Sequence, residues 1–172
     1  MTNIFRILAV VSSLTISAAA RAQAPQLPAT DVPAADIQKF LDGLPPTAVS
    51  DLPIRVVDVG GYKVGLYGVL RPKSTKQEAI LHRTKVTEVY YMLDGAGTLV
   101  TGGTLVAPTR ETTGLTGVSV RADRIDGGVS RRMTKGDVVI IPGGTPHWWS
   151  QLDGDIRYLI VRPDPEGKQA LK

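Results

Sequence analysis

Short apolar runs alternate with turn residues along most of this chain, and the pattern predicts a β-protein. From Leu52 onward, apolar side chains recur at every second position, which favours strands with one face in a core. Glycine pairs and Asp-Gly steps separate the runs, as expected of tight turns between strands. We predict strands at 54–59, 64–70, 88–93, 97–100, 105–106, 138–141, 147–151 and 156–161.

One short helix is predicted before the strands. Ile37, Phe40 and Leu41 fall at helical spacing, and Gly43 follows as a stop signal. Thr30 or Asp31 can cap the start of this helix, and Pro33 suits its first turn. We expect the helix to pack on the outside of the β-domain.

The first 22 residues have the pattern of a secretory signal peptide. Arg6 precedes a short apolar region, and a run of small residues ends near Ala22. The apolar region is too short to span a bilayer, so no stable membrane insertion is expected. We predict cleavage near Ala22 and a periplasmic or secreted protein, with an uncleaved anchor as the alternative.

Composition narrows the chemistry of the chain. The absence of cysteine excludes disulfides, thiol nucleophiles and thiolate metal sites. The formal charge of +4 is small and scattered, and no basic stripe carries interleaved aromatic residues, so we expect no binding to nucleic acid. The eighteen glycines and twelve prolines suit a turn-rich β-protein.

Both histidines of the chain lie beside predicted strands. A Pro-Gly-Gly corner at 142–144 follows the apolar strand 138–141, and His147 opens the next strand. Strict alternation would place His147, Trp149 and Gln151 on one face of that strand. His82 precedes Glu88 by six residues, and alternation places Glu88, Tyr90 and Met92 on one face of the upstream strand.

These two stretches resemble the two sequence motifs of the cupin superfamily. The first motif is matched at the family's spacing by His82, Glu88 and Gly95, and the second by Gly136, Pro142, Gly144 and His147. Three positions depart from the family pattern: Lys76 replaces the opening glycine, Thr84 the second histidine and Gln151 the final asparagine. The resemblance covers roughly residues 53–163.

The resemblance implies an all-β fold, a single cupin-like barrel of the double-stranded β-helix (jelly-roll) type with one short N-terminal helix. It divides the chain into a signal peptide (1–22), a linker with the short helix (23–51), the barrel domain (52–163) and a polar tail (164–172). The segment 103–132 is longer than a barrel hairpin needs, and we expect it to form a partly ordered excursion near the barrel mouth. Arg131 and Arg132, at its end, are either a solvated pair or a recognition site for carboxylate or phosphate.

The resemblance also implies that His82, Glu88 and His147 converge on a divalent metal ion inside the barrel. Two imidazoles and a carboxylate leave positions open for substrate or water, and they suit Mn, Fe, Zn, Ni and Cu alike. Thr84 would occupy the position of the missing ligand, either as a vestige or as the holder of a bound water. Tyr90, Met92, Trp149 and Gln151 are predicted to line the pocket, with ordinary core packing as the alternative for the first three.

Two functions remain open at this point. The first is an exported metal-dependent enzyme, an oxygenase, isomerase or lyase acting on a small organic molecule, with oxidoreductase chemistry favoured by family analogy. The second is a non-catalytic cupin that binds or senses a small ligand through a degenerate metal site. Cupins are often dimers, so a homodimer is compatible with either function.

Overall fold

The computed structural model describes residues 26–114 and 117–172, so the predicted signal peptide lies outside the described residues. One helix precedes thirteen strands in this part of the chain. The elements are α1 (Ala34–Asp42), β1 (Ser50–Asp58), β2 (Lys63–Arg71), β3 (Ala79–His82), β4 (Glu88–Asp94), β5 (Gly97–Thr101), β6 (Thr104–Val106), β7 (Arg110–Gly114), β8 (Gly117–Ala122), β9 (Arg124–Asp126), β10 (Val129–Met133), β11 (Val138–Ile141), β12 (His147–Leu152) and β13 (Ile156–Asp164).

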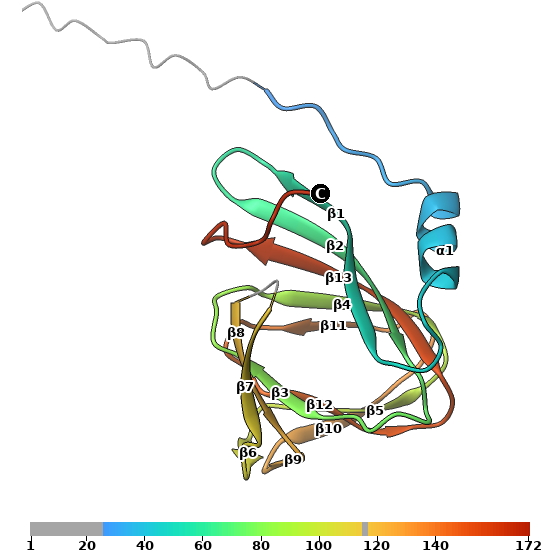
Figure 1. Cartoon of the computed structure of the whole chain (residues 1–172), viewed down its shortest axis with the longest axis vertical. Helices are drawn as coiled ribbons and strands as arrows, with labels where there is room; N and C mark the ends of the chain where they lie inside the picture. Colours follow the sequence, from blue (N-terminus) through green and yellow to red (C-terminus); the bar gives the residue numbers. More distant parts are fainter. Residues whose placement is uncertain (1–25, 115–116) are drawn as a thin grey trace, which may run out of the picture.

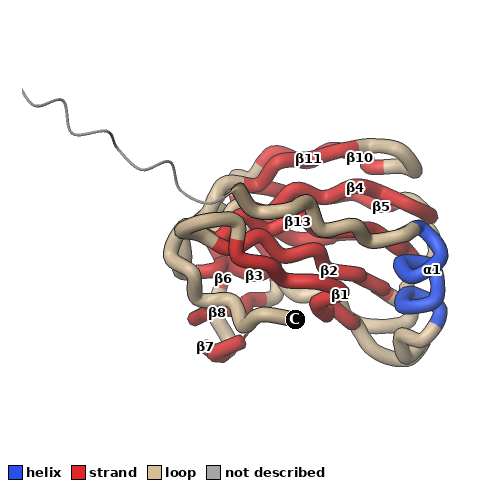
Figure 2. Tube along the Cα trace, turned by 90° about the horizontal axis from the view of Figure 1, so that it is seen from above, coloured by secondary structure: helices blue, strands red, loops and turns tan. Residues whose placement is uncertain are grey.

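Two antiparallel sheets face each other across the core (Figure 1). The first sheet has the strand order β1-β2-β13-β4-β11, and these strands lie side by side in Figure 2. The second has the order β10-β5-β12-β3-β8-β7, and β6 and β9 form a separate ribbon. Eight strands form four nested antiparallel pairs: β2 with β13, β3 with β12, β4 with β11 and β5 with β10. Nested pairs alternating between two sheets define a jelly roll, so the predicted double-stranded β-helix fold is confirmed.

Period-two alternation builds the core, as the sequence pattern predicted. In β13 the inward side chains Ile156, Tyr158 and Ile160 are at most 1% exposed, while the intervening residues are more exposed. The opposing sheet contributes Leu99 and Trp149 to the same cluster. The space between the sheets is therefore filled by large side chains except near the two histidines.

Helix α1 packs outside the barrel, as predicted. Gly68 on β2 makes this contact possible, because a Cβ at that position would lie 2.9 Å from the Phe40 ring. The helix begins after Pro33, which occupies the N-cap position without a side-chain cap, so neither Thr30 nor Asp31 has the predicted capping role. Gly43 ends the helix as expected.

The C-terminal segment, predicted as a polar tail, folds back onto the first sheet. Lys172 exchanges two backbone hydrogen bonds with Val56 on β1. Gln169 is completely buried, and its side chain accepts a hydrogen bond from Tyr67 Oη at 2.7 Å. The segment is polar in sequence, but it completes the interior behind β2.

The 103–132 insertion is more regular than its composition suggested. It contains β6 to β9, and β8 pairs with β3 to extend the second sheet. Residues 115–116, between β7 and β8, are outside the described part of the chain. The insertion therefore widens the barrel wall beside His82.

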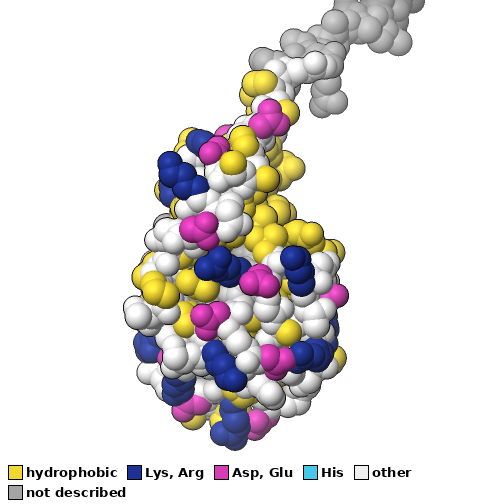
Figure 3. Space-filling view, turned by 90° about the vertical axis from the view of Figure 1, so that its right-hand side faces the viewer, with side chains coloured by type: hydrophobic (Ala, Val, Ile, Leu, Met, Phe, Trp, Pro, Cys, Tyr) yellow, Lys and Arg dark blue, Asp and Glu magenta, His cyan; other side chains and the backbone are white. Residues whose placement is uncertain are grey.

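On the face shown in Figure 3, acidic and basic side chains are interspersed, and no patch of one sign stands out. Among the residues that the structure describes, no helix combines the length and apolar character needed to cross a bilayer.

Candidate metal centre

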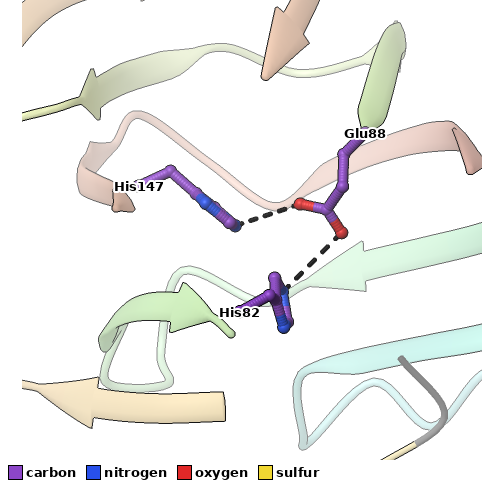
Figure 4. A group of neighbouring side chains, drawn as sticks. All are labelled: His82, Glu88 and His147. Carbon is purple, nitrogen blue, oxygen red and sulfur yellow. Dashed lines mark ion pairs between the residues drawn. The ribbon is translucent and has the colours of Figure 1, made fainter. Parts of the chain in front are cut away.

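His82, Glu88 and His147 converge inside the barrel, where one ligand atom from each lies within 4.8 Å of the others. Glu88 lies between the two imidazoles (Figure 4), with Oε2 at 3.2 Å from His147 Nε2 and Oε1 at 3.7 Å from His82 Nε2. Glu88 is 2% and His147 3% exposed. The two motif stretches thus meet as the family resemblance implied.

The Pro-Gly-Gly corner brings His147 to Glu88. Ile141 at the end of β11 pairs with Glu88, so the corner starts beside the carboxylate and carries the chain into the second sheet. Gly144 has a φ of +75°, in the region that favours glycine. A Cβ on Gly143 would lie 2.7 Å from the backbone carbonyl oxygen of Thr84, so this close crossing also requires glycine.

Each imidazole has a partner that orients its ring. His147 Nδ1 lies 3.0 Å from the carbonyl oxygen of Thr145, and a carbonyl only accepts hydrogen bonds. Nδ1 of His147 therefore carries a proton, and Nε2 faces Glu88. His82 Nδ1 contacts Ser119 Oγ at 2.7 Å. Burial lowers the pKa of His82 to about 4, although the nearby Glu88 opposes this effect, so the ring is neutral at ordinary pH.

Arg162 compensates the charge of Glu88. Its Nε donates to Glu88 Oε1 at 2.7 Å, and its remaining nitrogens donate to both oxygens of Asp51 at 2.8 and 2.6 Å. The guanidinium also lies 4.2 Å from the centre of the Tyr67 ring. Burial raises the pKa of Glu88, but Arg162 and His147 outweigh it and hold this pKa well below its usual range. The carboxylate is therefore ionised.

The other oxygen of Glu88, Oε2, faces His147. Tyr90 Oη donates to Glu88 Oε2 at 3.1 Å, and this is the oxygen nearest to His147. Arg162 and Tyr90 together fix the plane of the carboxylate. Such supporting contacts hold a ligand in its binding orientation.

A polar cavity of about 430 Å³ opens beside His82 and His147, which both line it. Its wall includes residues from both sheets and from the insertion, with three arginines: Arg71, Arg110 and Arg121. A second hollow, of about 540 Å³, lies under α1 and contains neither histidine. Of these two hollows, the polar cavity is the one that adjoins the candidate metal ligands, so it is the candidate binding site for a substrate or ligand.

The four predicted pocket residues differ in position. Tyr90 lines the cavity. Met92 and Trp149 are 0% and 2% exposed and belong to the central apolar cluster, the alternative considered for them. Gln151 is exposed, so the prediction that it shares a face with His147 and Trp149 is wrong. A register shift between Trp149 and Gln151 breaks the alternation and turns Leu152 inward instead.

Thr84 lies in the turn between β3 and β4, half-buried. Its Oγ1 accepts a long hydrogen bond of 3.4 Å from the backbone nitrogen of Val86. Its methyl group faces Gly117, where a Cβ would lie 2.9 Å away. Among the described residues, Thr84 is not part of the cavity wall.

Several residues of the site were not predicted from the sequence. Ser119 and Arg121 lie in the insertion, where they alternate with Val118, Val120 and Ala122, a strand signal that our prediction did not use. Arg162 falls just beyond the predicted strand 156–161, yet it continues the inward series of Tyr158 and Ile160 at the same two-residue spacing. Strand periodicity carried beyond Val161 would have identified it.

Comparisons with known proteins found similarity to this chain among solved structures. No protein-family model matches the chain, and no curated protein matches it either. Solved structures that match include BH2720 from Bacillus halodurans (10% identity, TM-score 0.48, 81% of this chain and 84% of that chain). An RmlC-like cupin family protein with a double-stranded β-helix fold from Methanocaldococcus jannaschii matches at 11% identity and TM-score 0.43, over 72% and 89% of the two chains. The DMSP lyase DddQ from Ruegeria pomeroyi matches at 14% identity and TM-score 0.42, over 83% and 78%.

Proposed function

We propose that this protein is an exported cupin that binds one divalent metal ion through His82, Glu88 and His147 and acts on a small organic molecule in the adjoining cavity. One observation carries the metal assignment. The Nε2 of His147 faces an ionised carboxylate oxygen at 3.2 Å, while Nδ1 of the same ring holds its proton for a carbonyl. A cation bound between the two groups would be coordinated by both, with the Nε2 lone pair and the carboxylate oxygen as ligands.

The donor set fits a divalent ion of the first transition row. Ligands bound at about 2.1 Å to one ion lie roughly 3–4 Å apart, and each histidine Nε2 lies within this range of one Glu88 oxygen, His147 of Oε2 and His82 of Oε1. The ring partners Ser119 and Thr145 leave the Nε2 atoms directed at Glu88. The ligand types suit Mn, Fe, Zn, Ni and Cu equally.

A bound ion would supply Lewis-acid polarisation of a substrate oxygen or activation of a water molecule. The protein supplies orientation: Arg162 and Tyr90 fix Glu88, and the surrounding barrel excludes bulk water from its carboxylate. Oxygenation, isomerisation and lyase reactions are all compatible with three protein ligands and open positions. Oxidoreductase chemistry is favoured only by analogy with other cupins.

A non-catalytic ligand-binding function is the second candidate, and Arg162 favours it. This arginine already balances the charge of Glu88 through contacts of 2.6 and 2.7 Å, so the buried carboxylate is satisfied without an ion. Thr84 at the position of the missing histidine points the same way. In this case His82 and His147 would form hydrogen bonds to the ligand.

Elemental mass spectrometry of protein purified without chelator or metal-affinity resin tests the proposal. We expect near-stoichiometric metal in the wild type and little in His147→Ala. Ser150→Ala, an exposed change on the same strand, is the matched control and should keep the metal. Equal metal content in all three proteins, or none in the wild type, would reject the ligand assignment. Intact mass of the exported protein tests cleavage near Ala22.

A further inference from the structure

The cavity contains more basic than acidic groups. Arg71, Arg110 and Arg121 lie in its wall, together with the carboxylates Asp51 and Glu78. Asp51 is already used, because both of its oxygens accept hydrogen bonds from Arg162. Glu78 alone therefore remains to balance three guanidinium groups.

Arg71 has only neutral partners. Its Nε donates to Tyr158 Oη at 2.7 Å and its Nη1 donates to Gln77 Oε1 at 3.0 Å. Within the described residues no carboxylate forms an ion pair with it. The phenol of Tyr158 belongs to the inward face of β13, so the guanidinium extends into the barrel. A partly buried cation without an anion is costly, which favours binding of an anion from solution.

Arg121 is also poorly paired. Glu78 makes two short hydrogen bonds to Arg110, at 2.8 and 2.6 Å, whereas Arg121 Nη1 lies 3.8 Å from the nearer oxygen. Burial lowers the pKa of Arg121, and the partial pairing with Glu78 opposes this effect. Its side chain is 31% exposed, which suits a group that meets ligand at the cavity mouth.

Strand register places Arg121 in line with His147. Ile80 on β3 pairs with His147 on one side and with Arg121 on the other. Directly paired residues of antiparallel strands share a face, so these three side chains project into the cavity in one row. Two strand spacings, about 10 Å, separate the backbones of His147 and Arg121. A molecule of several carbon atoms can therefore reach from one to the other.

We propose that the cavity binds a small organic anion whose carboxylate or phosphate is held by Arg71 and Arg121, with the remainder of the molecule directed at His82 and His147. Guanidinium groups recognise both oxyanions through paired hydrogen bonds. The inference rests on the proposed function for the role of the histidines, but the anion subsite itself needs no metal.

Calorimetric titration of metal-free protein, freed of chelator by desalting, tests the subsite. The probes are benzoate, propionate and inorganic phosphate, with benzamide and propionamide as uncharged analogues of the two carboxylates. We expect at least one anion to bind and its amide analogue to bind at least tenfold more weakly. Arg71→Gln and Arg121→Gln should each raise the Kd of that anion about tenfold or more. Preference for benzoate or propionate indicates an organic acid, and preference for phosphate a phosphate ester.

Arg124→Gln is the matched control, since Arg124 lies in the same insertion but pairs with Asp126 outside the cavity. It should leave the Kd within twofold. Because Arg71 contacts Tyr158 in the core, circular dichroism must show that Arg71→Gln is folded; Arg121→Gln tests the proposal without that risk.

Three results would overturn the subsite: no anion binds, benzamide and propionamide bind as well as the acids, or both arginine variants bind like wild type. Anions that bind only to metal-loaded protein, independently of Arg71 and Arg121, would also overturn it and leave the metal proposal intact. Conversely, arginine-dependent binding to a protein that takes up no metal would support the subsite and reject the metal proposal.

Discussion

Replacing Arg162 by methionine should cost the protein about 3–5 kcal/mol of unfolding free energy in the absence of metal. The side chain is 3% exposed and donates to two carboxylates, Glu88 and Asp51. Methionine keeps much of the volume but leaves the charge of Glu88 buried without its partner. Asp51 is 33% exposed on its side chain, so water screens part of its loss and most of the cost falls on Glu88.

Urea unfolding followed by tryptophan fluorescence measures this cost. The control is Arg157→Met on the same strand, whose exposed pair with Asp42 is expected to contribute no more than about 1 kcal/mol. A double-mutant cycle with Glu88→Gln isolates the pair, and we expect a coupling of about 1–3 kcal/mol. Saturating metal should reduce the effect of Arg162→Met, because the ion would take over the charge of Glu88.

The reasoning would be refuted if Arg162→Met lost no more stability than Arg157→Met. Strict additivity of the two changes in the cycle would likewise show that Glu88 does not depend on Arg162.

Three further changes test other parts of the structure. Ser119→Ala removes the partner of His82 Nδ1, so metal affinity, measured by competition with a chromophoric chelator, should fall about 10–100-fold. Ser130→Ala is an exposed control in the same insertion, and unchanged affinity in Ser119→Ala would show that Ser119 does not orient His82 for metal binding. Gly143→Ala puts a Cβ 2.7 Å from the Thr84 carbonyl oxygen, so both the melting temperature and metal content should drop, whereas Gly154→Ala, which meets no atom within 4 Å, should change neither. Gln169→Ala removes two buried hydrogen bonds and should lower the free energy of unfolding, measured in urea, by about 1–3 kcal/mol. An equal loss of stability in Lys168→Ala, the neighbouring exposed change, would show that Gln169 does not anchor the tail.

The sequence predicted the features that depend on local pattern. Strand alternation, the Pro-Gly-Gly corner and the spacing of His82, Glu88 and His147 led to the barrel and to the three central residues. Gln151 was misplaced because a register shift changes the face of every residue that follows it, and no local signal marks the shift.

The residues that sequence reasoning missed are fixed by long-range pairing. Arg121 enters the cavity only because β8 adds to the edge of β3, a choice that the polar composition of the insertion does not reveal. Arg162 is charged, and a charged side chain at the end of an apolar strand ordinarily faces water. Its burial depends on Glu88 and Asp51, which lie 74 and 111 positions away.

The nested strand pairs have a consequence for folding kinetics. Glu88 gains its counter-charge only after β13 has docked between β2 and β4, and Asp51 joins when β1 closes against β2. Contacts between residues so far apart in sequence form slowly, because closing the intervening loop costs conformational entropy before the contacts contribute favourable free energy. If the pairs of Arg162 with Glu88 and Asp51 form only after the main barrier to folding, they stabilise the native state and not the transition state. A ligand or ion bound beside Glu88 would then slow the unfolding of the barrel and leave its rate of folding almost unchanged.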